Sequence, residues 1–436
     1  MPERMKKELE KYFDRLWPIC RSITGNGLRR SLDILQEIIP LKIHEVPSGT
    51  RVFDWTVPDE WNIKDAFIIT PEGKKIASFA ENNLHVVNYS EPVKGEFTYE
   101  QLLPHLHTLP DQPDAIPYIT SYYKPSWGFC LTHKQFKSLP KKGRYKVLID
   151  ATLKSGNLTM ADLVLAGETD REILFSTYVC HPSMANNELS GPLVTAFLYR
   201  LIASLPHRKF TYRFVFAPET IGVITYLSRH GFNMRDKTDA GFVVTCVGDK
   251  GPFTYKRSRR TGTLTDRAAE HYLSHSKQKH RIVPFDVGGS DERQYCSPGF
   301  NMPVGSLMRT MYKEFPQYHT SLDNKKFISF DAMEATIRAY FEIVQLLELN
   351  DTYTSAVPFG EAFLGKRGLY EVNRKDQASS KRILDTLYVL AYTDGAHDLL
   401  SIASQRNLSV DELKIIVTEL LEQNLLIKTS KANEKN

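Results

Sequence analysis

The sequence predicts an α/β protein with a three-layer central domain, an inserted β-rich domain and a C-terminal winged helix-turn-helix. Three observations support this prediction. Apolar strand-like runs alternate with helical stretches over residues 151–350. Residues 45–150 instead show short alternating runs interrupted by Gly, Pro and Asn. Residues 380–429 read as three short helices followed by an apolar strand, and 436 residues exceed what one core usually organises.

The composition is that of a globular protein, with 42% hydrophobic and 25% charged residues. A net charge of +5 over 436 residues is too dilute to indicate a nucleic-acid binder or a membrane-surface protein. The five cysteines form no CxxC pair, which indicates free thiols in a reducing compartment. There is no signal-peptide pattern and no long uncharged apolar run, so we expect a cytoplasmic protein without a membrane span.

The chain opens with two predicted helices. Leu9, Phe13 and Leu16 recur at helical spacing, and a second helix over 28–39 follows the turn TGNG and stops at Pro40. We expect residues 1–44 and 151–350 to form the catalytic domain, 45–150 the inserted domain and 370–436 the winged helix.

The central domain is expected to contain four buried strands, because these segments are apolar at nearly every position and a sheet covered on both faces has that pattern. Helical stretches lie between them, as expected for a three-layer arrangement. The predicted strands are 172–180, 211–219, 240–249 and 301–309, and the predicted helices are 190–204, 221–231, 264–277 and 330–349.

Chemically active side chains follow these strands at their carboxyl ends, where ligands gather in an open α/β sheet. Histidine and carboxylate ligands suit zinc, and a carboxylate beside a catalytic zinc can relay a proton. The side chains concerned are His181 and Glu188 after the first strand, Glu219 and Asp249 at the ends of the next two, Asp291 and Tyr295 in GGSDERQY, and His319 in QYHTSLDN.

Each of these residues also has a purely structural interpretation. A loop histidine is usually a surface residue, a strand-end glutamate often caps a helix, and an aspartate after a strand is commonly a turn residue. Asp291 and Tyr295 could be a helix cap and a packed ring. YKRSRR (255–260) could face an anionic substrate, although a solvated loop is the commoner case, and YYKPSWGF (122–129) could form a substrate lip or pin the inserted domain. The shared location at strand ends favours a site.

Together, HPSMANNELSGP, PETIG, GGSDERQY and YHTSLDN resemble the zinc aminopeptidase-like family. More closely, the chain resembles bacterial proteins with an aminopeptidase-like domain that are often associated with polysaccharide-biosynthesis loci. The resemblance extends over the catalytic domain, the insert around PDEWNI and the winged-helix tail. It implies a zinc-exopeptidase-like fold with one or two Zn²⁺ ions.

The resemblance implies a role for several residues. His181 matches the first metal-binding histidine and His319 the last, while Glu219 stands where the family has a Glu-Glu pair. Asn187 takes the place of the aspartate that bridges two zincs, although the neighbouring Glu188 could fill that role instead, and Thr245 takes the place of the strand-end aspartate ligand. The predicted metal ligands are His181, Glu188, Asp249 and His319, with Glu219 as general base, Asp291 as a partner for the substrate amine and Tyr295 as an oxyanion donor.

We therefore expect a zinc-dependent, aminopeptidase-like hydrolase of a small peptide or aminoacyl conjugate. The alternatives are a catalytically silent scaffold that assembles through its winged helix, and a transcriptional regulator with a sensory α/β domain. Residues 380–436 carry a net charge of −1 and the candidate recognition helix 409–423 is acidic, which argues against nucleic acid. We expect the winged helix to contact protein, either the catalytic domain or a second copy in a homo-oligomer.

Overall fold

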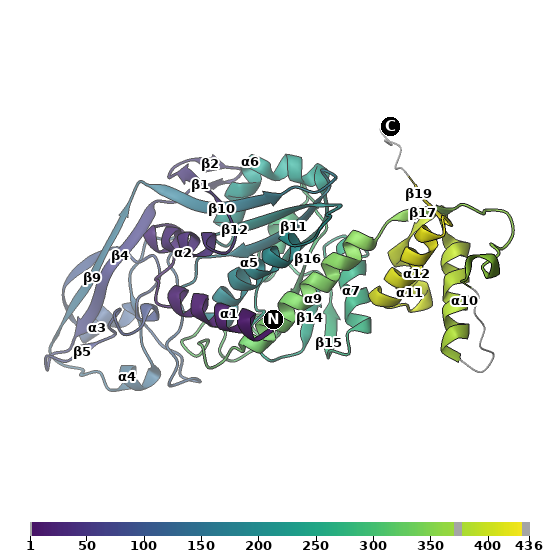
Figure 1. Ribbon diagram of the computed structural model, residues 1–436. Helices are drawn as coiled ribbons and strands as arrows, with labels where there is room; N and C mark the ends of the chain where they lie inside the picture. The colour runs from purple at the N-terminus through teal and green to yellow at the C-terminus, as the bar shows by residue number, and fades with distance from the viewer. Residues whose placement is uncertain (1, 370–376, 430–436) are drawn as a thin grey trace. The chain divides into compact units, whose positions relative to one another are not determined.

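The computed structural model describes residues 2–369 and 377–429 (Figure 1). The chain forms two compact units, one of residues 1–265 and 279–338 and the other of residues 266–278 and 339–436. No helix within the described residues is long and apolar enough to cross a membrane. The first unit contains the central sheet and the inserted β-rich region, and the second contains the C-terminal helices.

An eight-stranded mixed sheet organises the first unit (Figure 1). The four predicted strands lie next to one another and are parallel, and every residue of β11 and β12 is buried, as their apolar sequences predict. Antiparallel strands extend the sheet on both sides of this parallel centre. The strand order is β1 (Lys42–Pro47), β10 (Asn157–Leu165), β12 (Thr211–Ala217), β11 (Glu172–Tyr178), β13 (Thr238–Val243), β16 (Val304–Met308), β14 (Phe253–Lys256) and β15 (His280–Val283).

Helices cover both faces of this sheet, which gives the three layers. Adjacent residues of β12 show the two faces: Phe214 contacts Tyr199 of α5, with ring centroids 5.7 Å apart, whereas Arg213 donates to the Tyr226 hydroxyl of α6. The helices on the α5 side are α1 (Pro2–Leu16), α2 (Asn26–Gln36) and α5 (Ser190–Ala203), and those on the α6 side are α6 (Ile221–Lys237) and α8 (Glu292–Tyr295).

Helix α6 continues to Lys237, although the sequence predicts an end at 231. Gly231 is retained inside the helix because the ring of Phe300 lies 2.6 Å from where a Cβ would stand. The glycine therefore serves close packing and does not end the helix.

The inserted region forms a separate four-stranded antiparallel sheet, but its core is continuous with that of the central sheet. Trp61 and Phe129 of the insert belong to the same buried cluster as Leu158 and Val215 of the central strands. The strand order is β5 (Lys75–Ile76), β4 (Glu60–Ile69), β9 (Arg144–Lys154) and β6 (Val93–Thr98), and the smaller elements are β2 (Arg51–Val52), β3 (Trp55–Thr56), α3 (Tyr99–Leu102), β7 (Leu106–His107), β8 (Phe129–Cys130) and α4 (His133–Lys137).

The second unit contains the predicted three helices and final strand of a winged helix. A capping box at Ser409 and Glu412 begins α12, and Leu413, Val417 and Leu420 of that helix are buried in the unit's core. Of the predicted range 370–436, residues 370–376 and 430–436 lie outside the described residues. The elements are β17 (Thr352–Ser355), α10 (Gln377–Tyr392), β18 (Asp394–Asp398), α11 (Leu399–Arg406), α12 (Val410–Glu422) and β19 (Leu426–Lys428), while α7 (Leu264–His275) and α9 (Phe330–Leu349) contribute residues to both units.

Arg21 is a fully buried arginine in the turn between α1 and α2. Its guanidinium donates to the Leu16 carbonyl at 2.7 Å and to the His181 carbonyl at 3.1 Å, and its Nε lies 3.5 Å from Glu188 Oε1. The N-terminal helices are thereby linked to the loop that follows β11.

Substitution Arg21→Met should lower the free energy of unfolding by about 3–5 kcal/mol, because it leaves the Glu188 carboxyl and two carbonyls buried without their partner. Urea unfolding followed by circular dichroism would measure the loss. The matched control is Arg30→Met, since Arg30 is an exposed arginine of α2. Equal stability of the two variants would contradict the assigned role of Arg21.

A second ion pair joins α2 to the insert. Arg29 contacts Glu60 of β4 at 2.5 Å and Glu45 of β1 at 2.7 Å. The hydrogen bond from Arg29 lowers the pKa of Glu60 to about 2, and the Asn157 backbone N–H assists.

This lowered pKa predicts a pH-dependent contribution to stability. The contribution is present above the usual glutamate pKa of 4.5 and is lost as the pH falls towards 2, because the unfolded chain binds the proton first. Glu60→Gln should therefore cost about 1 kcal/mol at pH 7 and progressively less below pH 4.5. The control is Glu72→Gln, in the exposed turn between β4 and β5. Urea unfolding of both variants would be compared at pH 7 and at a pH below 4.5. A cost for Glu60→Gln that does not change with pH would refute the prediction.

Candidate active site

The loop after β11 brings His181 and Glu188 together. Ser183 has a left-handed backbone, with φ of 46°, and a single π-helical turn over Ala185–Leu189 leads into α5. Such turns are frequent at functional sites. Here the turn brings Glu188 Oε2 to 3.1 Å from His181 Nδ1, and both side chains are buried.

Glu219 and His319 join this pair from two other segments. Glu219 follows β12, and its Oε2 lies 3.7 Å from His181 Nε2. The rings of His181 and His319 have centroids 5.5 Å apart. Glu219 is the residue that solvent reaches, because 27% of its side chain is exposed against 4% for His181. Two imidazoles and two carboxylates thus form one cluster that opens towards solvent at Glu219.

The electrostatics of the cluster favour neutral imidazoles. Burial, reinforced by Arg21, lowers the pKa of His181 to about 3, and burial beside His181 lowers the pKa of His319 to about 3 as well. Neutral rings keep a nitrogen lone pair, which a metal ion requires.

The protein compensates the carboxylates of the cluster only in part. Burial raises the pKa of Glu188 to about 8 despite Arg21, and Glu188 Oε1 has no hydrogen-bond partner within the described residues. Burial and the neighbouring Asp291 raise the pKa of Glu219 well above its ordinary value. Buried carboxylates beside neutral histidines are the donor set that a divalent cation would stabilise. The residues therefore fit a zinc ion.

Cys180 lies in the same group, since its Sγ and donor atoms of His181 and Glu188 all lie within 4.8 Å of one another. Burial raises the pKa of the Cys180 thiol well above its ordinary value, and its sulfur accepts the Glu219 backbone N–H at 3.3 Å. A protonated thiol is a poor metal ligand, so we do not assign Cys180 to the metal.

The place of a second metal is held by neutral groups. The Tyr178 hydroxyl donates to Asn187 Oδ1 at 2.7 Å and lies 2.5 Å from the Thr245 hydroxyl. Asn187 and Thr245 stand where the aminopeptidase pattern has carboxylate ligands, and here they are satisfied by a buried hydrogen-bonded trio. Neutral oxygens already engaged in hydrogen bonds do not fit a second zinc.

The other predicted site residues lie around this cluster with different surroundings. Asp249 accepts four hydrogen bonds, from Asn186 Nδ2, the Gly251 N–H, and the N–H and hydroxyl of Thr310. Within the described residues, none of its hydrogen bonds involves His181, Glu188, Glu219 or His319. Its assignment as a metal ligand stays a prediction.

Asp291 lies near Glu219, whereas Tyr295 lies in the core. Asp291 Oδ1 accepts the Thr220 N–H at 2.8 Å, its Oδ2 has no partner within the described residues, and burial raises its pKa to about 7. The buried Tyr295 hydroxyl donates to Ser176 of β11 at 2.8 Å. Asp291 is thus placed beside the cluster, whereas the hydroxyl of Tyr295 is engaged within the sheet.

The basic run YKRSRR is not uniformly a solvated loop. Lys256 is buried in β14, where it pairs with Glu292 and donates to the Tyr312 hydroxyl at 2.7 Å. This lysine supports the core and is not available to an anionic substrate.

The sequence interpretation missed Asp323, which lies in the quoted YHTSLDN motif. Its carboxylate accepts the backbone N–H groups of Asn186 at 2.7 Å and Asn187 at 2.9 Å, and its carbonyl accepts that of Ala185. Asp323 therefore fixes the π-helical turn against the loop that carries His319. The position of Asp323 in the YHTSLDN motif was the one feature of the sequence that could have indicated this role.

The insert supplies a wall of the site. The Tyr118 N–H donates to the His319 carbonyl at 2.8 Å, and the Tyr118 ring centroid lies 5.1 Å from that of His181 and 5.2 Å from that of His319. The hydroxyls of Tyr118 and Tyr122 are 2.5 Å apart. Tyr122 also lines a cavity of about 520 Å³, which is walled by Trp55, Tyr89, Tyr123, Asp54 and Asp59, among others.

Comparisons with known proteins agree with this architecture. Residues 10–350 match the model of a family described as a domain of unknown function, DUF4910, and residues 351–428 match a winged helix-turn-helix family. A protein of Clostridium acetobutylicum, whose name provisionally assigns it to polysaccharide biosynthesis and gives it an aminopeptidase-like domain, is 44% identical over 419 residues, or 96% of each chain.

Solved structures show the same relationship. A crystal structure from Clostridium acetobutylicum, provisionally named a peptidase, covers 98% of this chain and 97% of its own with 43% identity and a TM-score of 0.92. BSAP, a zinc aminopeptidase from Bacillus subtilis, shares the fold at 10% identity and a TM-score of 0.55, covering 78% of this chain and 94% of its own. The chain therefore belongs to the DUF4910 family, as an aminopeptidase-like α/β protein with a β-rich insert and a C-terminal winged helix-turn-helix.

Proposed function

We propose that this protein is a zinc-dependent hydrolase that cleaves an amide or peptide bond in a small peptide or aminoacyl conjugate. The observation that carries the proposal is the gathering of two imidazoles and two carboxylates: Glu188 lies 3.1 Å from His181 Nδ1, the partly exposed Glu219 lies 3.7 Å from His181 Nε2, and the ring centroids of His181 and His319 are 5.5 Å apart. The likeness in fold to a zinc aminopeptidase, and the aminopeptidase-like domain named in the 44% identical relative, support it.

His181, Glu188 and His319 would hold one zinc ion, which would lower the pKa of a water molecule and polarise the substrate carbonyl. Glu219 is the general base in this scheme: its carboxylate accepts a proton from that water and delivers it to the leaving amine. Its position between His181 and solvent suits both transfers. Arg21 and Asp323 act as positioning residues, because they hold the Glu188 turn without facing solvent.

The substrate is proposed to enter along the insert. Asp291, with one carboxylate oxygen unpaired within the described residues, would receive the substrate ammonium group. The aromatic cavity beside Tyr122 would accept the apolar part of the aminoacyl group. Because Tyr295 donates to Ser176, its predicted oxyanion role requires its hydroxyl to turn away from β11.

The winged helix is proposed to contact protein, including a second copy of this chain, and not nucleic acid. Glu412 and Glu419 of α12 pair with Lys381 and Arg382 of α10, so two of the four carboxylates of this helix are engaged within the unit. A helix that contacts phosphates would need an excess of basic side chains. We also propose a cytoplasmic location, because the five cysteines are free.

A catalytically silent scaffold is the second candidate, and the neutral trio of Tyr178, Asn187 and Thr245 is the observation in its favour. That reading predicts no zinc between His181 and His319 and no turnover on a panel of aminoacyl anilides. The following two experiments separate the candidates.

Glu219→Gln should reduce turnover of an aminoacyl anilide by about 10²–10⁴-fold, because the amide cannot accept the proton from water. Zinc content and the thermal unfolding midpoint should stay at wild-type values. Glu168→Gln, with a side chain 64% exposed, is the matched control and should retain full activity. Normal turnover by Glu219→Gln would remove Glu219 as the base.

Removal of metal with a chelator should abolish turnover, and one equivalent of Zn²⁺ at the site should restore it. Anomalous scattering at the zinc edge should locate a single ion between His181 and His319, because the neutral trio excludes the second. Two ions at this position would contradict the single-metal assignment, and activity that survives chelation would contradict the proposed chemistry.

A further inference from the structure

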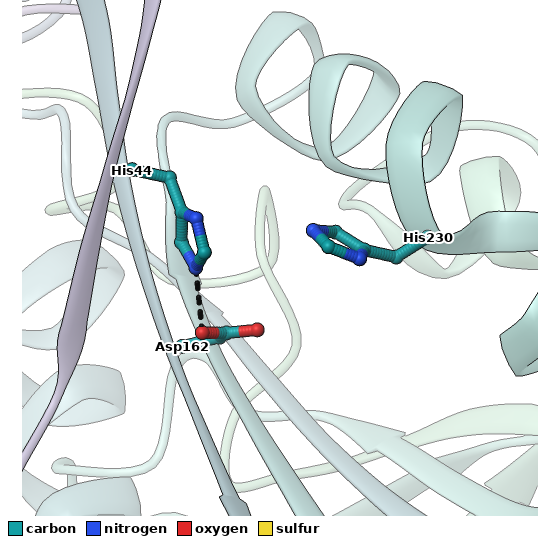
Figure 2. A group of neighbouring side chains, drawn as sticks. All are labelled: His44, Asp162 and His230. Carbon is teal, nitrogen blue, oxygen red and sulfur yellow. Dashed lines mark hydrogen bonds and ion pairs between the residues drawn. The ribbon is translucent and has the colours of Figure 1, made fainter.

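A second group of metal-ligand side chains lies on the α6 side of the sheet and uses no residue of the candidate active site. His44 on β1, Asp162 on β10 and His230 on α6 come from three distant parts of the chain (Figure 2). We propose that these three residues form a binding site for a divalent transition-metal ion, of which zinc is the representative, and that the bound ion fastens the edge strand β1 to α6.

The geometry is close to that of a metal site. One donor atom from each residue lies within 4.8 Å of the others, and His44 Nε2 is 2.7 Å from Asp162 Oδ1. Zinc binds histidine nitrogen at about 2.0–2.1 Å and carboxylate oxygen at about 2.0–2.2 Å, so its tetrahedral ligands are separated by about 3.3 Å. In Figure 2 the ring of His44 lies above Asp162 and that of His230 to its right, with a nitrogen of His230 directed towards His44. Small side-chain rotations would bring all three donors to one ion.

The charge balance favours a cation at Asp162. Its Oδ2 accepts the Tyr226 hydroxyl at 2.5 Å and lies 3.6 Å from Arg213 Nη1, while Oδ1 faces His44. Arg213 is already bound through two nitrogens to Glu172, each at 2.7 Å. Arg213 is therefore shared by two carboxylates and neutralises Asp162 only in part. Tyr226 and Arg213 would act as outer partners that orient the carboxylate.

The purely structural alternative is a buried hydrogen bond between His44 and Asp162. That alternative accounts for two residues and leaves His230 unexplained. The ring of His230 packs on Tyr226, with centroids 4.6 Å apart, and lies 5.8 Å from the ring of His44. A metal ion coordinated by His44, Asp162 and His230 would involve all three side chains.

Bound metal would connect two elements that the sheet does not pair directly. Strand β1 is the outermost strand of the sheet and is hydrogen-bonded to β10 alone among the described strands. An ion held by His44 and His230 would cross-link this strand to α6, since metal binding is coupled to folding when the ligands come from separate segments. The site would take the three protein ligands and one water.

The test isolates this site from the candidate active site. Full-length protein with His181→Ala and His319→Ala, stripped of metal, should bind about one Zn²⁺ per chain in calorimetric titration, and Zn²⁺ should raise its unfolding midpoint. Adding His230→Gln should weaken binding by about 100-fold or more, since loss of even an outer partner typically costs 10–100-fold. Adding His207→Gln, whose side chain is 87% exposed, is the control and should leave the affinity unchanged.

Two results would overturn the proposal: no stoichiometric zinc in the double-alanine background, or equal affinity with and without His230→Gln. Should that background fail to fold, zinc-edge anomalous scattering from crystals of the wild-type chain decides, because an ion between His44 and His230 is expected and its absence refutes the site. Anilide turnover by His230→Gln alone should equal that of the wild type. A negative result for the His44–Asp162–His230 site can therefore be distinguished from a negative result for the proposed hydrolase activity.

Discussion

The contact on which the site depends is that of the buried Arg21 guanidinium with Glu188 and the His181 carbonyl. A guanidinium removed from water is costly unless it meets acceptors, so the turn between α1 and α2 and the loop after β11 must pack together. Burial is the main cause of the lowered pKa of His181, and the Arg21 cation beside it adds to the effect. One buried charge thus serves both the packing of the N-terminal helices and the state of a candidate metal ligand.

The candidate site is assembled from loops that stabilise one another. Asp323 accepts the backbone N–H groups of the π-helical turn that carries Glu188, and Tyr118 of the insert donates to the carbonyl of His319. His319 itself has a left-handed backbone, with φ of 54°, which costs energy for a non-glycine residue unless its surroundings hold it. The inserted region therefore helps to form the candidate site, and its core is continuous with that of the central sheet.

Hydrogen bonding beside the site is the basis of the proposal that it holds one metal ion and not two. Carboxylates that face each other in a dry pocket need a cation between them. Tyr178, Asn187 and Thr245 satisfy one another without any charge, so this half of the pocket is stable without a metal. The carboxylates of Glu188 and Glu219 remain uncompensated by such contacts, and the single-metal proposal follows from that difference.

The sequence by itself determined the buried strands of the central sheet, the helices between them and the acidic winged helix, because these depend on the local periodicity of apolar residues and on charge. It also indicated His181, Glu219 and His319, since ligands gather at the ends of parallel strands. The roles of Arg21 and Asp323, the engagement of Asp249 with Thr310, and the meeting of His44 with His230 were decided by tertiary structure alone. These contacts join residues far apart in the chain, and no local pattern specifies which of many polar side chains will share a buried hydrogen bond.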